Sequence, residues 1–170
     1  MLRFVGVLLL CLGGTLIGLG GAKGLKSRVD TLLSFLSGLS LMEAEMQFHL
    51  TPMPELLKKL SRDVDGPAKA FFFQCKEALW QLEDTPLSVI WRKNLHIEAL
   101  TLEEEDRQVL EQLGAVLGQY DLDGQMRAIG SARLRLEECL EKANARRTSL
   151  GRVYSALGMA AGILSVLLLI

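Results

Sequence analysis

The chain has few cysteines. Its 170 residues include three, at Cys11, Cys75 and Cys139, which are odd in number, widely spaced and form no C-x-x-C pair. A disulfide framework or a structural zinc site needs paired or closely spaced cysteines, so neither is indicated. A reducing compartment is the simpler interpretation, and we expect the central part of the chain to be cytoplasmic.

The chain also lacks a basic surplus and a catalytic motif. Between Lys23 and Arg152 it has 18 basic and 20 acidic residues, a formal charge of −2. Nucleic-acid binding needs a basic face that neutralises phosphates, so this class is excluded. No serine or cysteine accompanies His49 or His96 in a nucleophile arrangement, and no phosphate-binding glycine loop is present. We predict no enzyme, no metal, no cofactor and no small-molecule substrate.

Charge is absent from both ends of the chain. Residues 4–22 form an uncharged run of 19 residues, and residues 153–170 form a second of 18. At about 1.5 Å per residue, each run is just long enough to cross a hydrocarbon core of about 30 Å as a helix. The pattern predicts two transmembrane helices that flank one central domain, residues 23–152, which is large enough for a single core.

The charges beside the two runs predict how the chain is oriented. Basic residues follow the first run and precede the second, whereas only Arg3 and the amino terminus oppose them. The positive-inside rule therefore predicts a cytoplasmic central domain with both termini outside. Arg3 and the small residues 20–22 also allow a cleaved signal peptide, but the run exceeds the usual apolar segment of about 7–15 residues. The predicted basic flanks are Lys23, Lys26, Arg28, Arg146, Arg147 and Arg152.

Small residues recur four apart in both runs. Gly14 and Gly18 lie in the first, and Gly158 and Gly162 in the second. This spacing lets helix backbones approach closely, so the two helices are candidates to pack on each other or on partner spans. The alternative is that the glycines carry no packing role, because glycine is common in membrane helices.

The central domain has helical periodicity throughout and no strand-length alternating run. An apolar stripe at three-to-four spacing indicates a long helix that continues from the first run towards Phe48. Later helix starts are indicated at Thr51-Pro52 and Thr85-Pro86, each with the threonine as N-cap and the proline at the first helical position, and at Gly66-Pro67. The stripe consists of Leu25, Val29, Leu32, Leu36 and Leu39.

Two further starts complete the helix pattern. Thr101 and Glu104 have capping-box spacing, and the acidic cluster at 103–106 suits the first turn of a helix as a solvated start. Asp121 is a candidate cap for the last helix. The prediction is an all-α fold, an antiparallel bundle of about five or six helices flanked by the amino- and carboxy-terminal transmembrane helices.

The apolar stripe, continued by four residues, reaches Glu43. We therefore expect this carboxylate to face the core or a groove, with Arg107, Arg127 or a backbone amide as its partner, because an unpaired buried carboxylate is costly. A structural ion pair is one interpretation. The other is that Glu43 and Glu45 contribute to a docking groove for another protein.

Two stretches resemble a known family. The stretch 42–57, MEAEMQFHLTPMPELL, is similar to the LExEI…TPLxxAL signature of stage III sporulation protein AB, with methionine where that pattern has leucine or isoleucine. The stretch 113–125, LGAVLGQYDLDGQ, is similar to that family's LGxxLGxxDxxxQ pattern. The signature positions, which are candidates for partner binding, are Glu43, Glu45, Thr51, Pro52, Gly114, Gly118, Asp121 and Gln125.

Most of these positions also have an architectural interpretation. Thr51 and Pro52 suit a helix start and Asp121 a cap, while Gly114 and Gly118, four apart in a helix pattern, are expected to allow close helix packing.

The resemblance implies a function. It implies a membrane protein in the mother-cell membrane that faces the forespore, required for endospore formation as part of a secretion-like channel. Its helical domain is expected to be similar to the type II secretion F-type platform protein. The implied partners are a secretion-type ATPase, other membrane subunits of the channel and membrane lipid. The alternative is a structural membrane anchor or a membrane-remodelling protein without ATPase coupling.

Overall fold

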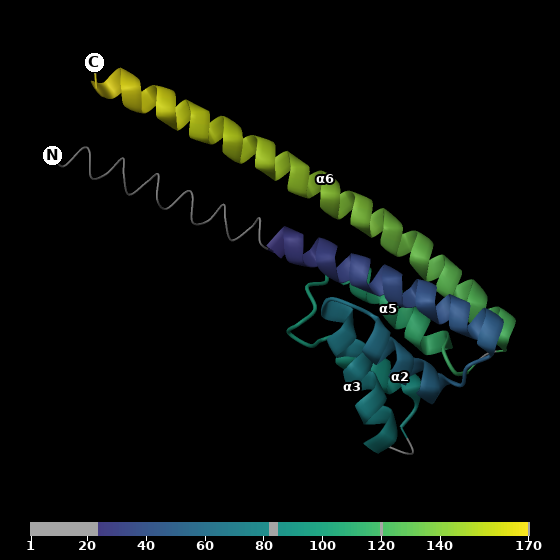
Figure 1. The fold of residues 1–170 in the computed structure, drawn as a ribbon. Coiled ribbons are helices and arrows are strands. Elements are labelled where there is room, and N and C mark those ends of the chain that lie inside the picture. The colour runs from purple at the N-terminus through teal and green to yellow at the C-terminus, as the bar shows by residue number, and fades with distance from the viewer. Residues whose placement is uncertain (1–23, 82–84, 120, 170) are drawn as a thin grey trace. The chain divides into compact units, whose positions relative to one another are not determined.

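The computed structural model describes residues 24–81, 85–119 and 121–169, with side chains up to Ser149. All its described elements are helical, and the long opening helix and α6 stand out in Figure 1. The opening helix covers residues 24–44 and continues into a π-helical turn. The other elements are η1 (Glu45–His49), α2 (Met53–Asp63), α3 (Pro67–Gln81), α4 (Leu87–Asn94), α5 (Glu104–Val116) and α6 (Leu122–Leu169).

The chain divides into two compact units. One comprises Arg28–Glu141, which we call the helical domain. The other comprises Met1–Ser27 with Lys142–Ile170, which we call the flanking unit. The described part of the flanking unit is helical and includes the second half of α6.

Within the helical domain, the opening helix and the first part of α6 run antiparallel and side by side (Figure 1). The ion pair between Glu43 and Arg133 joins the two helices. Successive short helices pack on one another, α2 on α3, α3 on α4 and α4 on α5. This arrangement confirms the all-helical prediction.

Aromatic side chains form the centre of the core. Phe35, Phe71, Phe72 and Trp91 are all fully buried. Edge-on contacts join the rings, with 4.7 Å between the centroids of Phe71 and Trp91 and 5.2 Å between those of Phe35 and Phe71. Each such pair stabilises a fold by about 0.5–1.5 kcal/mol beyond the burial of its surface. The cluster therefore ties the opening helix to α3 and α4.

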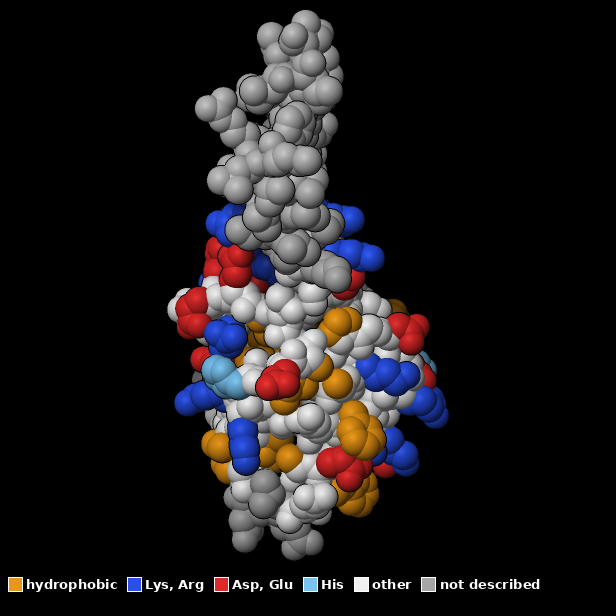
Figure 2. Space-filling view, turned by 90° about the vertical axis from the view of Figure 1, so that its left-hand side faces the viewer, with side chains coloured by type: hydrophobic (Ala, Val, Ile, Leu, Met, Phe, Trp, Pro, Cys, Tyr) orange, Lys and Arg blue, Asp and Glu red, His pale blue; other side chains and the backbone are white. Residues whose placement is uncertain are grey.

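The outer surface of the domain is mixed. Acidic, basic and hydrophobic side chains are interspersed on the face that Figure 2 shows. The most exposed of the large apolar side chains in the described part are Phe48 and Leu50, which follow the opening helix.

Some of the predicted helix starts are correct. Pro67 is the first residue of α3, and Gly66 before it has φ +85°, a conformation that glycine adopts without a Cβ clash. Asp121 caps α6, because its Oδ1 accepts a hydrogen bond of 3.2 Å from the backbone N–H of Gly124. This geometry satisfies one of the free N–H groups at the helix start.

The predicted threonine caps are wrong. Helix α2 begins at Met53 and α4 at Leu87, and the residues in the N-cap positions are Pro52 and Pro86, neither of which supplies a side-chain cap. Both prolines have an extended ψ, 148° and 142°, so each lies just outside its helix. The carbonyl of Pro52 accepts the first helical hydrogen bond, from Leu56 N–H at 2.9 Å.

The capping box of α5 is also shifted. It joins Glu103 and Asp106 instead of Thr101 and Glu104: the Glu103 side chain accepts from the N3 backbone, and Asp106 accepts from Glu103 N–H at 2.9 Å. The acidic cluster is thus a helix start as expected, but Asp106 within it is fully buried instead of solvated.

Candidate functional site

The turn after the opening helix is built around a buried carboxylate. Glu45 begins η1 and is buried. Its Oε1 accepts a hydrogen bond of 2.5 Å from Lys59 Nζ on α2, and its Oε2 accepts one of 3.1 Å from the Thr51 hydroxyl. The Lys59 hydrogen bond is the main cause that holds the pKa of the Glu45 carboxyl below its usual value. The carboxylate therefore ties the turn to α2 through Oε1 and to Thr51, just before α2, through Oε2.

This turn has two unusual backbone features. Residues 45–49 form a π-helix, a rare conformation that occurs often at functional sites. Leu50 then has φ +50° in the left-handed region, where a side chain with a Cβ costs about 1–2 kcal/mol. Glu45 O accepts from the N–H of Leu50, which closes the turn. The hydrogen bonds of Glu45 to Lys59 and Thr51 therefore stabilise a turn whose backbone is strained.

The strained turn exposes apolar side chains. Phe48 is 74% exposed and Leu50 is 68% exposed. Together we call them the apolar tip. They lie at the end of the helical domain opposite to Arg28 and Glu141, because the opening helix runs from Arg28 to the turn.

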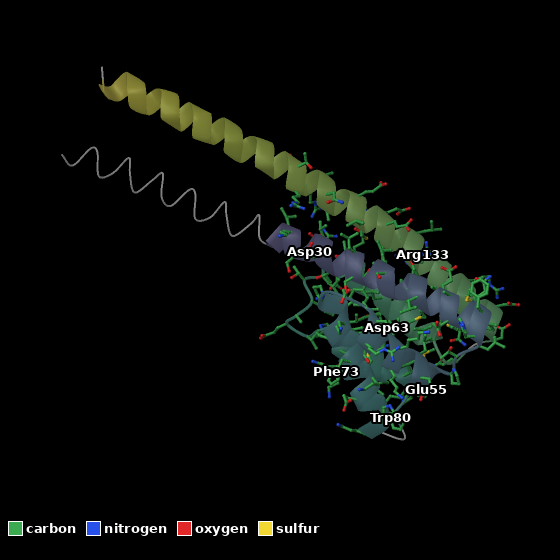
Figure 3. All side chains as sticks on the ribbon, in the orientation of Figure 1. Asp30, Glu55, Asp63, Phe73, Trp80 and Arg133 are labelled. Atoms are coloured by element: carbon green, nitrogen blue, oxygen red, sulfur yellow. The ribbon has the colours of Figure 1, made fainter. Side chains whose placement is uncertain are left out.

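Glu43 does not face the core. It is half-buried and pairs with Arg133 of α6, labelled in Figure 3, and not with Arg107 or Arg127. The fully buried neighbour is Met42. A helix turn contains 3.6 residues, so the stripe continues from Leu39 by three residues to Met42, and the step of four that predicted Glu43 was wrong.

Gly114 confirms the predicted close packing of helices. A Cβ added there would lie 2.2 Å from Trp91 Cδ1, a separation that real Cβ atoms do not show. The indole Nε1 of Trp91 donates a hydrogen bond of 2.8 Å to Leu110 O on the same helix as the glycine. Gly114 therefore makes the space that the Trp91 ring occupies beside α5.

Gly118 has a different role from the one predicted. It follows the end of α5 with φ +79°, so it reverses the chain and does not pack one helix on another. Its N–H donates a hydrogen bond of 3.0 Å to Gln125 Oε1 on α6. Gly118, Asp121 and Gln125 thus share the α5–α6 turn.

In the described part of the chain, no group of three His, Cys, Asp or Glu side chains is placed to hold a metal ion. Burial raises the pKa of the Cys75 thiol to about 12, so this thiol stays protonated at neutral pH. A hollow of about 140 Å³ between α5 and α6 is lined mainly by apolar side chains such as Val109 and Leu113.

The two predicted membrane spans lie wholly or partly outside the part of the chain that the structure describes. Residues 4–22, with Gly14 and Gly18, lie outside the described residues. The second predicted span belongs to α6 up to Leu169, but its side chains, with the surroundings of Gly158 and Gly162, also lie outside the described part. Across the residues that the structure does describe, no helix combines the length and apolarity needed to cross a membrane.

The sequence as a whole matches a family model. The model for stage III sporulation protein AB covers residues 3–170 of the chain. The chain belongs to this family. Stage III sporulation protein AB of Bacillus subtilis (strain 168) is 25% identical over 171 residues, 99% of each chain.

A solved structure of a stage III sporulation protein AB has a similar fold. The structure of SpoIIIAB is similar with a TM-score of 0.65 and 22% identity, over 72% of this chain and 98% of that one. At this identity the likeness supports the fold and nothing further. The family assignment confirms the resemblance that the two stretches indicated.

In this member of the stage III sporulation protein AB family, the signature positions form two groups. Glu45, Thr51 and Pro52 build the strained turn, and Glu43 joins that end of the opening helix to α6. The α5–α6 turn holds the other positions, apart from Gly114, which lies against Trp91. The antiparallel course of the opening helix and α6 brings both turns to one end of the helical domain (Figure 1).

Sequence reasoning missed the buried ion pair of this family member. Asp106 accepts two hydrogen bonds of 2.8 Å from the guanidinium of Arg28, one from Nε and one from Nη2, and both side chains are buried. Burial alone raises the pKa of the Asp106 carboxyl, but the hydrogen bonds from Arg28 and from Glu103 N–H bring it below its usual value. The signal was present, because Asp106 shares one helix face with Val109, Leu110 and Leu113.

Proposed function

We propose that this protein is a non-enzymatic, membrane-anchored platform subunit of a secretion-like channel between mother cell and forespore, required for endospore formation. Residues 4–22 and 153–170 anchor it in the mother-cell membrane that faces the forespore. The domain between them, 23–152, lies in the cytoplasm. Membership of a sporulation family and the two uncharged runs support this proposal.

The apolar tip is the observation that carries the docking role. Phe48 and Leu50 are the most exposed of the large apolar side chains in the described part, and a strained turn holds them in place. Strain of this kind persists only where the surrounding contacts enforce it, and it is concentrated at functional sites. We assign the tip to the capture of a secretion-type ATPase, while Glu43 and Glu45 support the tip and do not contact the partner through free carboxylates.

In-cell crosslinking tests the docking role. A photoreactive amino acid replaces Phe48 in one full-length variant and Phe73 in another; Phe73 is half-exposed on α3 and labelled in Figure 3. In sporulating mother cells we expect a secretion-type ATPase, identified by mass spectrometry, to crosslink at position 48 and not at position 73. Crosslinks to ring or membrane subunits alone would favour the alternative, a structural anchor or remodelling protein without ATPase coupling.

Two substitutions of Leu50 distinguish an effect on docking from an effect on stability. Leu50→Gly removes the apolar side chain and the left-handed strain, so we expect stability to rise by up to about 1 kcal/mol while the position-48 crosslink weakens. Leu50→Ala removes the side chain but keeps a Cβ at φ +50°, so it weakens the crosslink without that gain. Thermal unfolding and crosslink yield are measured on the same full-length variants. Full crosslinking by both variants would exclude Leu50 from the docking surface.

A further inference from the structure

The two compact units differ sharply in charge. The flanking unit, Met1–Ser27 with Lys142–Ile170, contains seven basic residues and no acidic residue. The helical domain, Arg28–Glu141, contains the other 12 basic residues and all 20 acidic residues, a formal charge of −8. A chain with a net charge of −1 is thus a basic unit joined to an acidic one.

The boundary between the two charges is abrupt. Along α6 the last acidic residue is Glu141, and Lys142 follows it directly. In the opening helix the first acidic residue of the whole chain is Asp30. Six of the seven basic residues of the flanking unit, all but Arg3, therefore lie between a predicted span and the helical domain.

Four basic side chains of the flanking unit lie among the residues whose side chains the structure describes, and all four are accessible. Lys26, Lys142, Arg146 and Arg147 are all exposed, and we call these four the basic collar. Arg28, two residues beyond Lys26, differs from them, because its guanidinium is buried against Asp106. Among the described side chains of the flanking unit, the accessible positive charge is therefore that of the collar.

We propose that the basic collar binds the phosphate headgroups of anionic phospholipids. The proposal rests on the proposed function, in which the adjoining runs cross the membrane. Each Lys or Arg close to an anionic membrane surface strengthens binding of the protein to that surface about fivefold. The attraction fades within a Debye length of the surface. The acidic helical domain is repelled by the same surface, so the charge division keeps its surface free of lipid and available to proteins.

The test measures which lipids surround the full-length chain. The protein is reconstituted into vesicles of phosphatidylcholine and phosphatidylglycerol in equal amounts, and the vesicles are washed at alkaline pH. Discs are then extracted with a styrene–maleic acid copolymer, and the lipids in protein-containing discs are quantified by mass spectrometry against empty discs. We expect phosphatidylglycerol to be enriched about twofold or more around the wild-type chain, and less so at high salt.

Two triple variants that lose the same charge show which basic residues cause the phosphatidylglycerol enrichment. Lys142→Gln/Arg146→Gln/Arg147→Gln should abolish most of the enrichment. The control Lys58→Gln/Arg92→Gln/Lys93→Gln removes three exposed charges from the helical domain and should leave the enrichment intact. Equal enrichment in all three proteins, or equal loss in both variants, would overturn the collar as the binding site.

The wash separates this inference from the proposed function. A chain that stays in the vesicles without phosphatidylglycerol enrichment would refute lipid binding by the collar and leave the membrane anchor intact. A chain that the alkaline wash removes would overturn the anchor and, with it, the collar.

Discussion

At the scale of single residues, one glycine decides how α4 meets α5. In Gly114→Ala the new Cβ would lie 2.2 Å from the Trp91 ring, which is fully buried and cannot move without displacing its aromatic neighbours. Overpacking of a core costs about 1–3 kcal/mol, more than the gain of up to about 1 kcal/mol in helix propensity. We expect a net loss of stability in thermal unfolding followed by circular dichroism.

Gly130 offers the matched control. It lies in α6, and a Cβ there would meet nothing within 4 Å. Gly130→Ala should therefore be neutral or stabilising by up to about 1 kcal/mol. If both alanine variants were equally stable, the close contact of Gly114 with Trp91 would not constrain the fold.

The buried pair of Arg28 and Asp106 predicts a second residue-scale effect. Asp106→Asn removes the buried counter-charge of Arg28 and leaves it only the half-exposed carboxylate of Glu103, 2.7 Å away, so we expect a loss of up to about 3–5 kcal/mol. Arg28→Met/Asp106→Leu removes both charges and should recover part of that loss. Urea unfolding of the full-length chain measures both variants. A double variant as unstable as Asp106→Asn would show that the loss comes from packing or capping.

The same pair predicts a pH dependence. The folded-state pKa of Asp106 lies below its usual value, near 3.9 for an unfolded aspartate, so the pair contributes its full stability above that pH. The contribution is lost as the pH falls below about 4 towards the folded-state pKa. Unfolding at a series of acidic pH values should show a steeper loss for the wild-type chain than for Arg28→Met/Asp106→Leu. Parallel curves of stability against pH for the two proteins would show that this pair does not contribute to the acid sensitivity.

At the scale of helices, Asp121 controls the start of α6. Its carboxylate accepts from Gly124 N–H, and replacing such a cap by alanine costs about 1 kcal/mol. Asp121→Ala should lower the free energy of unfolding by that amount in urea unfolding. Asp123→Ala, in the first turn of the same helix but not in its cap, is the control and should change stability less. Equal effects would mean that only the acidic charge near the helix start matters.

Helix identity was predictable from local pattern, whereas exact boundaries were not. Pro67 and Asp121 start helices as predicted, because glycine or a capping carboxylate acts on neighbouring backbone groups. Thr51 has the composition of a cap, but its hydroxyl donates to Glu45, a partner provided by the folded turn. The π-helix and the left-handed Leu50 likewise depend on contacts with α2 that no local pattern contains.

Prediction of the candidate site shows the same division. The sequence indicated two stretches whose turns the fold brings to one end of the domain. It assigned their side chains less well: Glu43 pairs with Arg133, 90 positions along the chain, and Gly118 reverses the chain instead of packing a helix. No sequence pattern identified Phe48 and Leu50 as exposed, because the exposure of an apolar residue is decided by tertiary packing.

At the scale of the whole molecule, the division of charge supports a specific topology. Basic residues next to a span tend to stay in the cytoplasm, and those of the flanking unit, except Arg3, lie beside the uncharged runs on the side of the helical domain. We therefore predict that alkaline phosphatase fused after Ile170 is active in a bacterial host and that a green fluorescent protein fused there is dark. Fused after Arg147, before the second run, the two reporters should behave in the opposite way.

Charge reversal shows whether the basic residues set this topology. Arg146→Glu/Arg147→Glu/Arg152→Glu should give a mixed orientation with reduced phosphatase activity after Ile170, because these residues no longer favour the cytoplasmic side. A fluorescent carboxy-terminal fusion in the unchanged chain would refute the predicted second span. The intact mass of the membrane-extracted protein tests the first span separately: loss of about 20 residues would identify a cleaved signal peptide, whereas the full mass would establish that residues 4–22 are retained.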